Sequence, residues 1–142
     1  MKYIYIFICL WTNVCLAQNK ETVFLYFDAN SKELCNIPQD QKGRYNKNSN
    51  LKRFVKIVQN DKNTIFYICK EQFINSQKDK RDTCKVNLLN TIKFSKIENL
   101  IEQVNKVNPL YPDKVFNNIY IIEKINDSFF VKYKVKWKYY IE

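Results

Sequence analysis

Histidine is absent from this 142-residue chain, and Gly43 is its only glycine. Ser-His-Asp triads, histidine general bases and histidine-containing zinc sites all need an imidazole. Phosphate-binding loops and nucleophile elbows need several glycines at fixed spacing. Carboxylates remain, but nothing in their spacing brings two of them together on one face. We therefore expect a protein that is not an enzyme and uses no cofactor, and a hydrolase of unrecognised type is only a third hypothesis.

The N-terminal residues carry the three parts of a secretory signal peptide. Lys2 gives a positive start, Tyr3–Trp11 is apolar, and Cys15-Leu16-Ala17 has the small-x-small pattern of a cleavage site. The apolar run is shorter than the roughly 20 residues that span a bilayer. We predict a signal peptide over residues 1–17 and a single domain over residues 18–142. The mature chain would then be periplasmic or secreted, with no transmembrane span; an uncleaved anchor and a buried first strand are the alternatives.

Three cysteines, Cys35, Cys69 and Cys84, remain after such a cleavage. In an oxidising compartment two of the three should pair and one should be left over. We predict the pair Cys69–Cys84, which would close the polar stretch between them. The three have no C-x-x-C spacing and no histidine nearby, so we expect no metal site.

The formal net charge of +10 indicates anionic partners. A basic surface attracts acidic proteins, membrane surfaces, acidic polysaccharides and nucleic acid without choosing among them. Export makes nucleic acid the least available of these. We expect the partner to be an acidic protein or another anionic component of the cell envelope.

The stretch from Asn118 to Glu142 is the most strongly patterned part of the chain. From Phe129 onward, apolar residues alternate with lysines, as in a strand with one buried and one polar face. The residues of the polar face are Phe130, Lys132, Lys134, Lys136, Lys138 and Tyr140. Asn126-Asp127-Ser128 suits a three-residue hairpin loop, which sets Ile119 and Ile121 on the apolar face.

Other strands are expected upstream of this hairpin. Thr22–Phe27 is a short apolar run, and Lys52–Gln59 and Thr64–Lys70 flank a turn-forming segment. Glu71–Asp82 turns polar and predicts a solvated loop. Val86–Phe94 fits either a strand or a helical turn followed by an extended piece.

One amphipathic helix is predicted to begin at Ser95. Ser95-Lys96-Ile97-Glu98 is a capping box, in which the Ser95 side chain and the Glu98 side chain satisfy each other's backbone N–H groups. Apolar residues then follow with helical spacing at Ile97, Leu100, Ile101, Val104 and Val107. Asn108-Pro109 ends the helix, and its apolar stripe would cover the apolar face of the hairpin.

These elements predict an α+β fold, with a single antiparallel sheet of about five strands and one main helix packed on one face. The first functional hypothesis is a non-enzymatic exported protein that binds another macromolecule, such as an inhibitor or a toxin-immunity protein. Its binding surface would be the lysine face or the polar loop from Asn36 to Leu51.

The alternative function is the binding of an anionic small ligand, lipid or glycan. The four lysines would hold the anion, and Phe130 and Tyr140 at the two ends of the row would stack a ring. This hypothesis needs a concavity beside the lysine face. A simpler explanation is a solvated face whose lysines discourage aggregation of a long aromatic strand.

Overall fold

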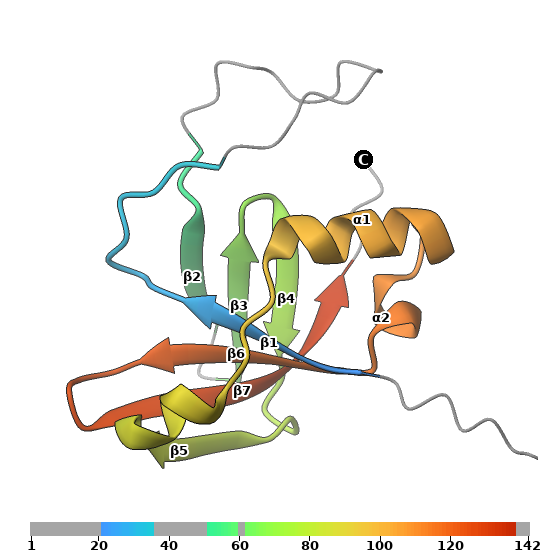
Figure 1. The fold of residues 1–142 in the computed structure, drawn as a ribbon. Helices are drawn as coiled ribbons and strands as arrows, with labels where there is room; N and C mark the ends of the chain where they lie inside the picture. The colour runs from blue at the N-terminus through green and yellow to red at the C-terminus, as the bar shows by residue number, and fades with distance from the viewer. Residues whose placement is uncertain (1–20, 36–50, 60–61, 139–142) are drawn as a thin grey trace, which may run out of the picture.

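The computed structural model describes residues 21–35, 51–59 and 62–138. Within these ranges the structure is mixed α/β and mostly sheet, with seven strands and three helices, of which only α1 is long (Figure 1). The strands are β1 (Thr22–Phe27), β2 (Phe54–Gln59), β3 (Asn63–Ile68), β4 (Glu71–Asn75), β5 (Arg81–Lys85), β6 (Asn118–Lys124) and β7 (Phe129–Lys138). The helices are the 3₁₀ helix η1 (Val86–Thr91), α1 (Ile97–Val107) and α2 (Pro112–Val115).

All seven strands belong to one sheet that is organised around β7. Their order is β1-β6-β7-β4-β3-β2, and β5 also pairs with β7. β5 lies beside the first part of β7, where Lys85 is opposite Phe129, and β4 lies beside its end, where Gln72 is opposite Lys138. The strands β2, β3 and β4 run across the direction of β1 and β6 in Figure 1. β7 therefore joins two differently oriented parts of the sheet.

The hairpin of β6 and β7 has the predicted register. Ile121 is opposite Tyr133 and Ile119 is opposite Val135, which corresponds to a three-residue loop at Asn126–Ser128. The Asn126 side-chain oxygen accepts hydrogen bonds from the backbone N–H groups of Ser128 and Phe129 at 2.8 and 2.9 Å. This is the turn chemistry expected of asparagine.

The expectation of a purely antiparallel sheet of about five strands is corrected in two ways. First, β1 pairs with β6 in parallel, with Thr22 opposite Asn118. Second, the expected solvated loop Glu71–Asp82 contains β4 and begins β5. Phe73 in β4 is fully buried against Trp137. Its packing and the ladder to β3 outweigh the polar composition around it, because strand formation depends strongly on context.

The chain between β5 and α1 crosses from one face of the sheet to the other. Val86–Phe94 is a helical turn followed by extended residues, one of the two expected alternatives. The Phe94 ring contacts the Tyr26 ring at 5.6 Å, and the Ser95 N–H donates to the Phe24 carbonyl at 2.8 Å. The crossing thus passes over the free edge of β1 before α1 begins.

The predicted capping box at the start of α1 is wrong. The N-cap residue is Lys96, and no side chain caps the helix. Ser95 belongs to the crossing segment, and the Glu98 carboxylate accepts a hydrogen bond from Arg53 Nη1 at 2.8 Å. The Glu98 carboxylate therefore forms an ion pair with Arg53 instead of the capping-box hydrogen bond to the Ser95 backbone N–H. The end of the helix at Val107 is as expected.

The main core lies between α1 and the face of β7 that carries Tyr133, Val135 and Trp137, which we call the inner face. Ile97, Leu100 and Val104 of α1 belong to the same buried cluster as these residues. The predicted covering of the apolar hairpin face by the helix is confirmed. The opposite face, which carries Phe130 and the lysines, is called the outer face.

The disulfide joins Cys35 to Cys69, so the predicted pair Cys69–Cys84 is wrong. The Cys35 N–H donates to Leu51 and the Cys69 N–H donates to Arg53, which places the two cysteines side by side with a Cα–Cα distance of 5.4 Å. Cys84 lies in β5 opposite Phe130 and is a free thiol. The strand β4, absent from the expectation, carries the chain away from Cys69 before Cys84 is reached.

Candidate functional site

The lysine row lies on the outer face of β7, and the two parts of the row have different surroundings. Residues directly opposite in neighbouring strands share a face, so the register defines the two parts. The covered half comprises the outer face of β1, β6, β5 and the first part of β7, through Lys134. The open half comprises the outer face of β2, β3, β4 and the end of β7, with Lys136 and Lys138.

The covered half is packed and electrostatically paired. Phe130 is only 1% exposed, and Ile122 of β6 is fully buried on the same face. η1 and the extended residues after it lie on this side of the hairpin, away from α1 (Figure 1). Lys132 Nζ is 3.5 Å from the Asp82 carboxylate and 5.3 Å from the centre of the Tyr120 ring. A buried Phe130 leaves no ring face for a ligand to stack on.

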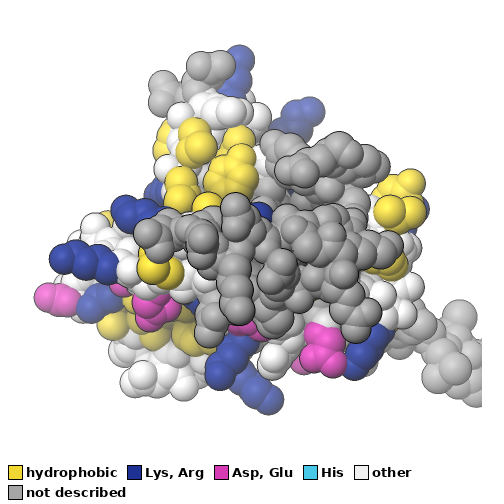
Figure 2. Space-filling model, turned by 90° about the horizontal axis from the view of Figure 1, so that it is seen from above, with side chains coloured by type: hydrophobic (Ala, Val, Ile, Leu, Met, Phe, Trp, Pro, Cys, Tyr) yellow, Lys and Arg dark blue, Asp and Glu magenta, His cyan; other side chains and the backbone are white. Residues whose placement is uncertain are grey.

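The open half exposes aliphatic side chains. Val55 and Ile57 of β2 are 37% and 43% exposed, and across the strands they share the outer face with Ile65, Tyr67 and Ile74. None of the described helices packs on this face, because α1 lies against the inner face. Figure 2 shows hydrophobic side chains gathered at its upper left, next to lysine or arginine side chains.

The lysines at the end of the row lack close acidic partners. Among the described residues, neither Lys136 nor Lys138 forms an ion pair, and both are exposed. Asp79 lies near the middle of the row. Its slight burial tends to raise the pKa, but hydrogen bonds from Ser76 and the charges of Lys136 and Lys134 lower the pKa of Asp79 overall. Among the described residues, the positive charge is therefore least compensated at Lys138.

A cleft lies beside these two lysines, between the segment around α2 and the end of β7. Its volume is about 270 Å³. The lining residues are Leu110, Tyr111, Pro112, Asp113, Lys136, Trp137 and Lys138. The sequence alone predicts the lysines but not the cleft, because the Asn108–Pro112 turn that forms its other wall lies far from them along the chain. Tyr140, the last residue of the predicted site, is outside the described residues.

A second polar cluster lies within the inner face. Lys56 Nζ donates to Glu123 Oε2 at 2.6 Å, and the Tyr133 hydroxyl donates to the same oxygen at 3.2 Å. Burial tends to lower the pKa of Lys56, but the hydrogen bond and charge of Glu123 raise it overall. Burial also raises the pKa of Tyr133. Both groups therefore hold their protons more firmly, the opposite of what an activated base or nucleophile needs.

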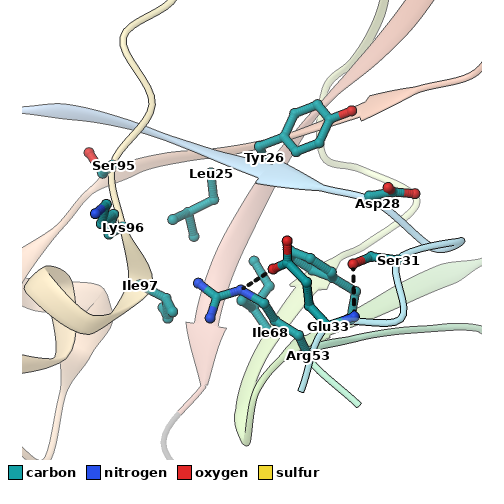
Figure 3. Close-up of a pocket in the computed structure, with 11 residues that line it drawn as sticks. Leu25, Tyr26, Asp28, Ser31, Glu33, Arg53, Ile68, Ser95, Lys96 and Ile97 are labelled. Atoms are coloured by element: carbon teal, nitrogen blue, oxygen red, sulfur yellow. Dashed lines mark hydrogen bonds and ion pairs between the residues drawn. The ribbon is translucent and has the colours of Figure 1, made fainter. Parts of the chain in front are cut away.

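A cavity of about 240 Å³ lies between the end of β1, the start of β2 and the start of α1 (Figure 3). Its charged centre is Arg53, which lies 3.6 Å from Glu33 and 2.8 Å from Glu98. Partial burial tends to raise the pKa of Glu98, but the hydrogen bonds and charge of Arg53 lower it overall. The guanidinium group is thus already neutralised by two carboxylates, and we assign no anion site there.

Within the described ranges, no cluster of three or more potential metal-ligating side chains is found. No helix in these ranges is both long enough and apolar enough to cross a membrane. Comparison of the chain with known proteins gave no matching family model, curated protein or solved structure.

The sequence alone does not single out the open half as a candidate surface. Val55 and Ile57 alternate with Lys56, which in sequence fits either a buried or an exposed strand face. Lys56 points to the inner face and reaches Glu123, so the two aliphatic residues point outward. The contact between Lys56 and Glu123 therefore shows which face of β2 is the inner face.

Proposed function

We propose that this protein is an exported, non-enzymatic binding protein whose partner is an acidic protein. An inhibitor or a toxin-immunity protein would fit this description. The open half of the outer face is the binding surface in this proposal. The observation that carries it is the presence of exposed aliphatic residues, and of lysines with no ion pair among the described residues, on a sheet face that no described helix covers.

The aliphatic part supports a protein partner rather than a dissolved ion. Val55 and Ile57 expose apolar area, and on the same face Tyr67 and Ile74 are half-buried and Ile65 is buried. Burying such area against a partner contributes roughly 25 cal/mol per Å². Apolar centres bordered by polar groups are typical of protein–protein interfaces.

The charged part supports an acidic partner. Lys136 is directly opposite Ile74 in β4. Strands in a sheet are about 4.8 Å apart, and Ile57 in β2 lies three strands away from β7. Neither Lys136 nor Lys138 forms an ion pair with a carboxylate of the described residues. A partner with acidic residues beside an apolar centre would match this arrangement, and the attraction would speed association.

The test is capture of acidic proteins from an envelope extract by the immobilised protein and two matched variants. Ile57→Asp places a charge in the open half, and Leu88→Asp makes the same change at a residue of η1 that is 48% exposed. We expect Ile57→Asp to abolish retention and Leu88→Asp to preserve it. Lys136→Glu combined with Lys138→Glu should also weaken retention, more at about 50 mM than at about 300 mM salt because salt screens charges.

Two results would overturn the proposal. One is the absence of any acidic protein retained specifically at low and moderate salt. The other is equal retention by the wild type and Ile57→Asp, which would move the interaction to another surface. Circular dichroism of each variant checks that the fold is kept.

Export is the second element of the proposal and has a separate test. It rests on the signal-peptide pattern of residues 1–17, which lie outside the described residues. The Cys35–Cys69 disulfide supports it, since such bonds persist mainly in oxidising compartments. The intact mass of the protein from the cells that produce it should correspond to a chain beginning at Gln18. A mass that includes residues 1–17 would contradict cleavage.

A further inference from the structure

We propose that the cleft between α2 and the end of β7 binds a small anion that carries a flat apolar ring. This inference does not rest on the protein partner proposed above, although both sites use Lys136 and Lys138. The cleft lies on the side of β7 that faces Tyr111, whereas the apolar part of the partner surface lies over β2, β3 and β4. It also supplies the concavity that an anion site on the lysine row requires.

Trp137 lines the floor of the cleft but is only 2% exposed, so it supports the cleft and the exposed ring that a ligand can pack on is Tyr111. Trp137 packs on Phe116 with nearly parallel rings at 6.3 Å and on Phe73 at 5.2 Å. Its Nε1–H donates to Glu71 Oε2 at 2.7 Å, which fixes the orientation of the indole. A floor held in this way costs little conformational entropy when a ligand is bound.

The opposite wall is formed by the turn before and at the start of α2. Tyr111 is 51% exposed, and Lys114 Nζ lies 4.4 Å from the centre of its ring. Leu110 and Pro112 complete the apolar part of this wall. Flat rings pack well against such aromatic and apolar side chains.

The charges at the cleft favour an anion. Lys136 and Lys138 contribute to its lining, and Asp113 is the single carboxylate among the lining residues. Neither lysine has an ion-pair partner in the described part of the chain, so an incoming anion would not compete with an existing salt bridge. A volume of about 270 Å³ is at the small end of ligand sites and suits a molecule of one or two rings.

The probe for the test is 2-naphthoate, and 2-naphthalenemethanol is its uncharged match. Binding is followed through the indole N–H signal of Trp137 in ¹⁵N–¹H NMR spectra, since Trp137 and Trp11 are the two tryptophans of the chain. Protein that begins at Gln18 lacks Trp11, so its single indole signal is that of Trp137. We expect a saturable shift of the Trp137 signal with 2-naphthoate and a clearly weaker response with the uncharged compound.

The variants separate the cleft from the rest of the lysine row. Lys136→Gln combined with Lys138→Gln should weaken 2-naphthoate binding about fivefold, as expected for the loss of two exposed charge contacts. Lys132→Gln combined with Lys134→Gln is the matched control and should change it less than about twofold. Tyr111→Ala should weaken binding of both compounds, because it removes a wall of the cleft.

Four results would overturn the inference, and the first three concern the cleft itself. These are the lack of a saturable Trp137 shift, an equal affinity for the two compounds, and an unchanged affinity after replacement of Lys136 and Lys138. Loss of binding in the Ile57→Asp variant would also contradict it, since Ile57 belongs to the partner surface. The spectrum of each variant reports whether it is folded.

Discussion

The two halves of the outer face are made by one strand, β7, yet they have opposite properties. In the covered half, Phe130 is buried on the face of the sheet where η1 lies, and Lys132 forms an ion pair with Asp82. In the open half, Ile57 is partly exposed, and Lys136 and Lys138 have no ion pair among the described residues. The same period-two pattern therefore contributes to a core in one place and to a surface in the other.

The difference comes from the neighbours of β7 rather than from β7 itself. β5 brings Asp82 opposite Lys132, and the chain after β5 covers the first half. β4 brings Ile74 and Gln72 opposite the last lysines, and no described helix follows on that side. No described helix covers the outer face at the end of β7. Both proposals therefore use this part of the strand.

The largest contrast is expected from truncating one apolar residue in each half. Phe130→Ala should lower the free energy of unfolding by about 3–5 kcal/mol, because it leaves a cavity in a packed region. Ile57→Ala should lower it by less than about 1 kcal/mol, because the side chain is already partly exposed. Urea denaturation of both variants measures the difference. Similar losses would mean that the open half is not a free surface.

The cysteines give the next contrast. Cys35→Ser removes a disulfide between residues separated by 34 positions. The free energy of unfolding should fall by about 3–4 kcal/mol, because the unfolded chain without the bond has more conformational entropy. Cys84→Ser in the covered half should cost less than about 1 kcal/mol, since its thiol is free and only partly buried. Thermal unfolding under non-reducing conditions compares the two. A large effect of Cys84→Ser would point to an unrecognised bond at that thiol.

Two carboxylates beside β7, Glu71 and Asp79, should respond to pH with opposite signs. Burial raises the pKa of Glu71, only partly opposed by the hydrogen bond from Trp137, so the folded protein loses stability from this group as pH rises above about 4.5. Glu71→Gln keeps an acceptor for Trp137 and should be more stable than the wild type at pH 7. At pH 3.5 the two should be nearly equal.

Asp79 is the matched carboxylate for this pH experiment. Its slight burial is outweighed by Ser76 and the lysine charges, so its pKa is lowered, and its stabilising contribution is lost as pH falls through that lowered value. Asp79→Asn should therefore be less stable than the wild type at pH 7 and similar to it at pH 2. Urea denaturation at these pH values tests both carboxylates. The same sign for both variants would contradict the account.

The smallest effect is expected from the ion pair in the covered half. Asp82→Asn removes the partner of Lys132 and of Lys80, at 3.5 and 3.4 Å, and should cost less than about 1 kcal/mol at low salt. Lys136→Gln in the open half should cost nothing measurable, as no pair is broken. The effect of Asp82→Asn should vanish at about 1 M salt, where charges are screened within a few ångströms. A salt-independent loss in Asp82→Asn would indicate a packing role.

Much of the local structure was predictable because it depends on side-chain pattern over short distances. The bounds of β1, the hairpin register at Asn126–Ser128 and the end of α1 at Val107 all agree with the sequence analysis. The start of α1 was not predictable in the same way. Glu98 could satisfy either the helix terminus or Arg53, and Arg53 is 45 residues away in the chain.

The candidate site was only partly predictable. The lysines were found from the alternation in β7, but their division into paired and unpaired members depends on β5 and β4, which the polar stretch around Glu71–Asp82 concealed. The cleft also needs the turn at Tyr111, which packing brings to the end of β7. Neither contact leaves a signal in the local sequence.

The sequence by itself determined which residues alternate, where the hairpin turns and which helical stripe is apolar, since each depends on neighbours a few positions apart. Tertiary structure alone decided the parallel pairing of β1, the Cys35–Cys69 bond and which end of the lysine row stays uncovered. These features depend on contacts between distant segments, and their free energies are set by burial and pairing that exist only after the sheet has assembled.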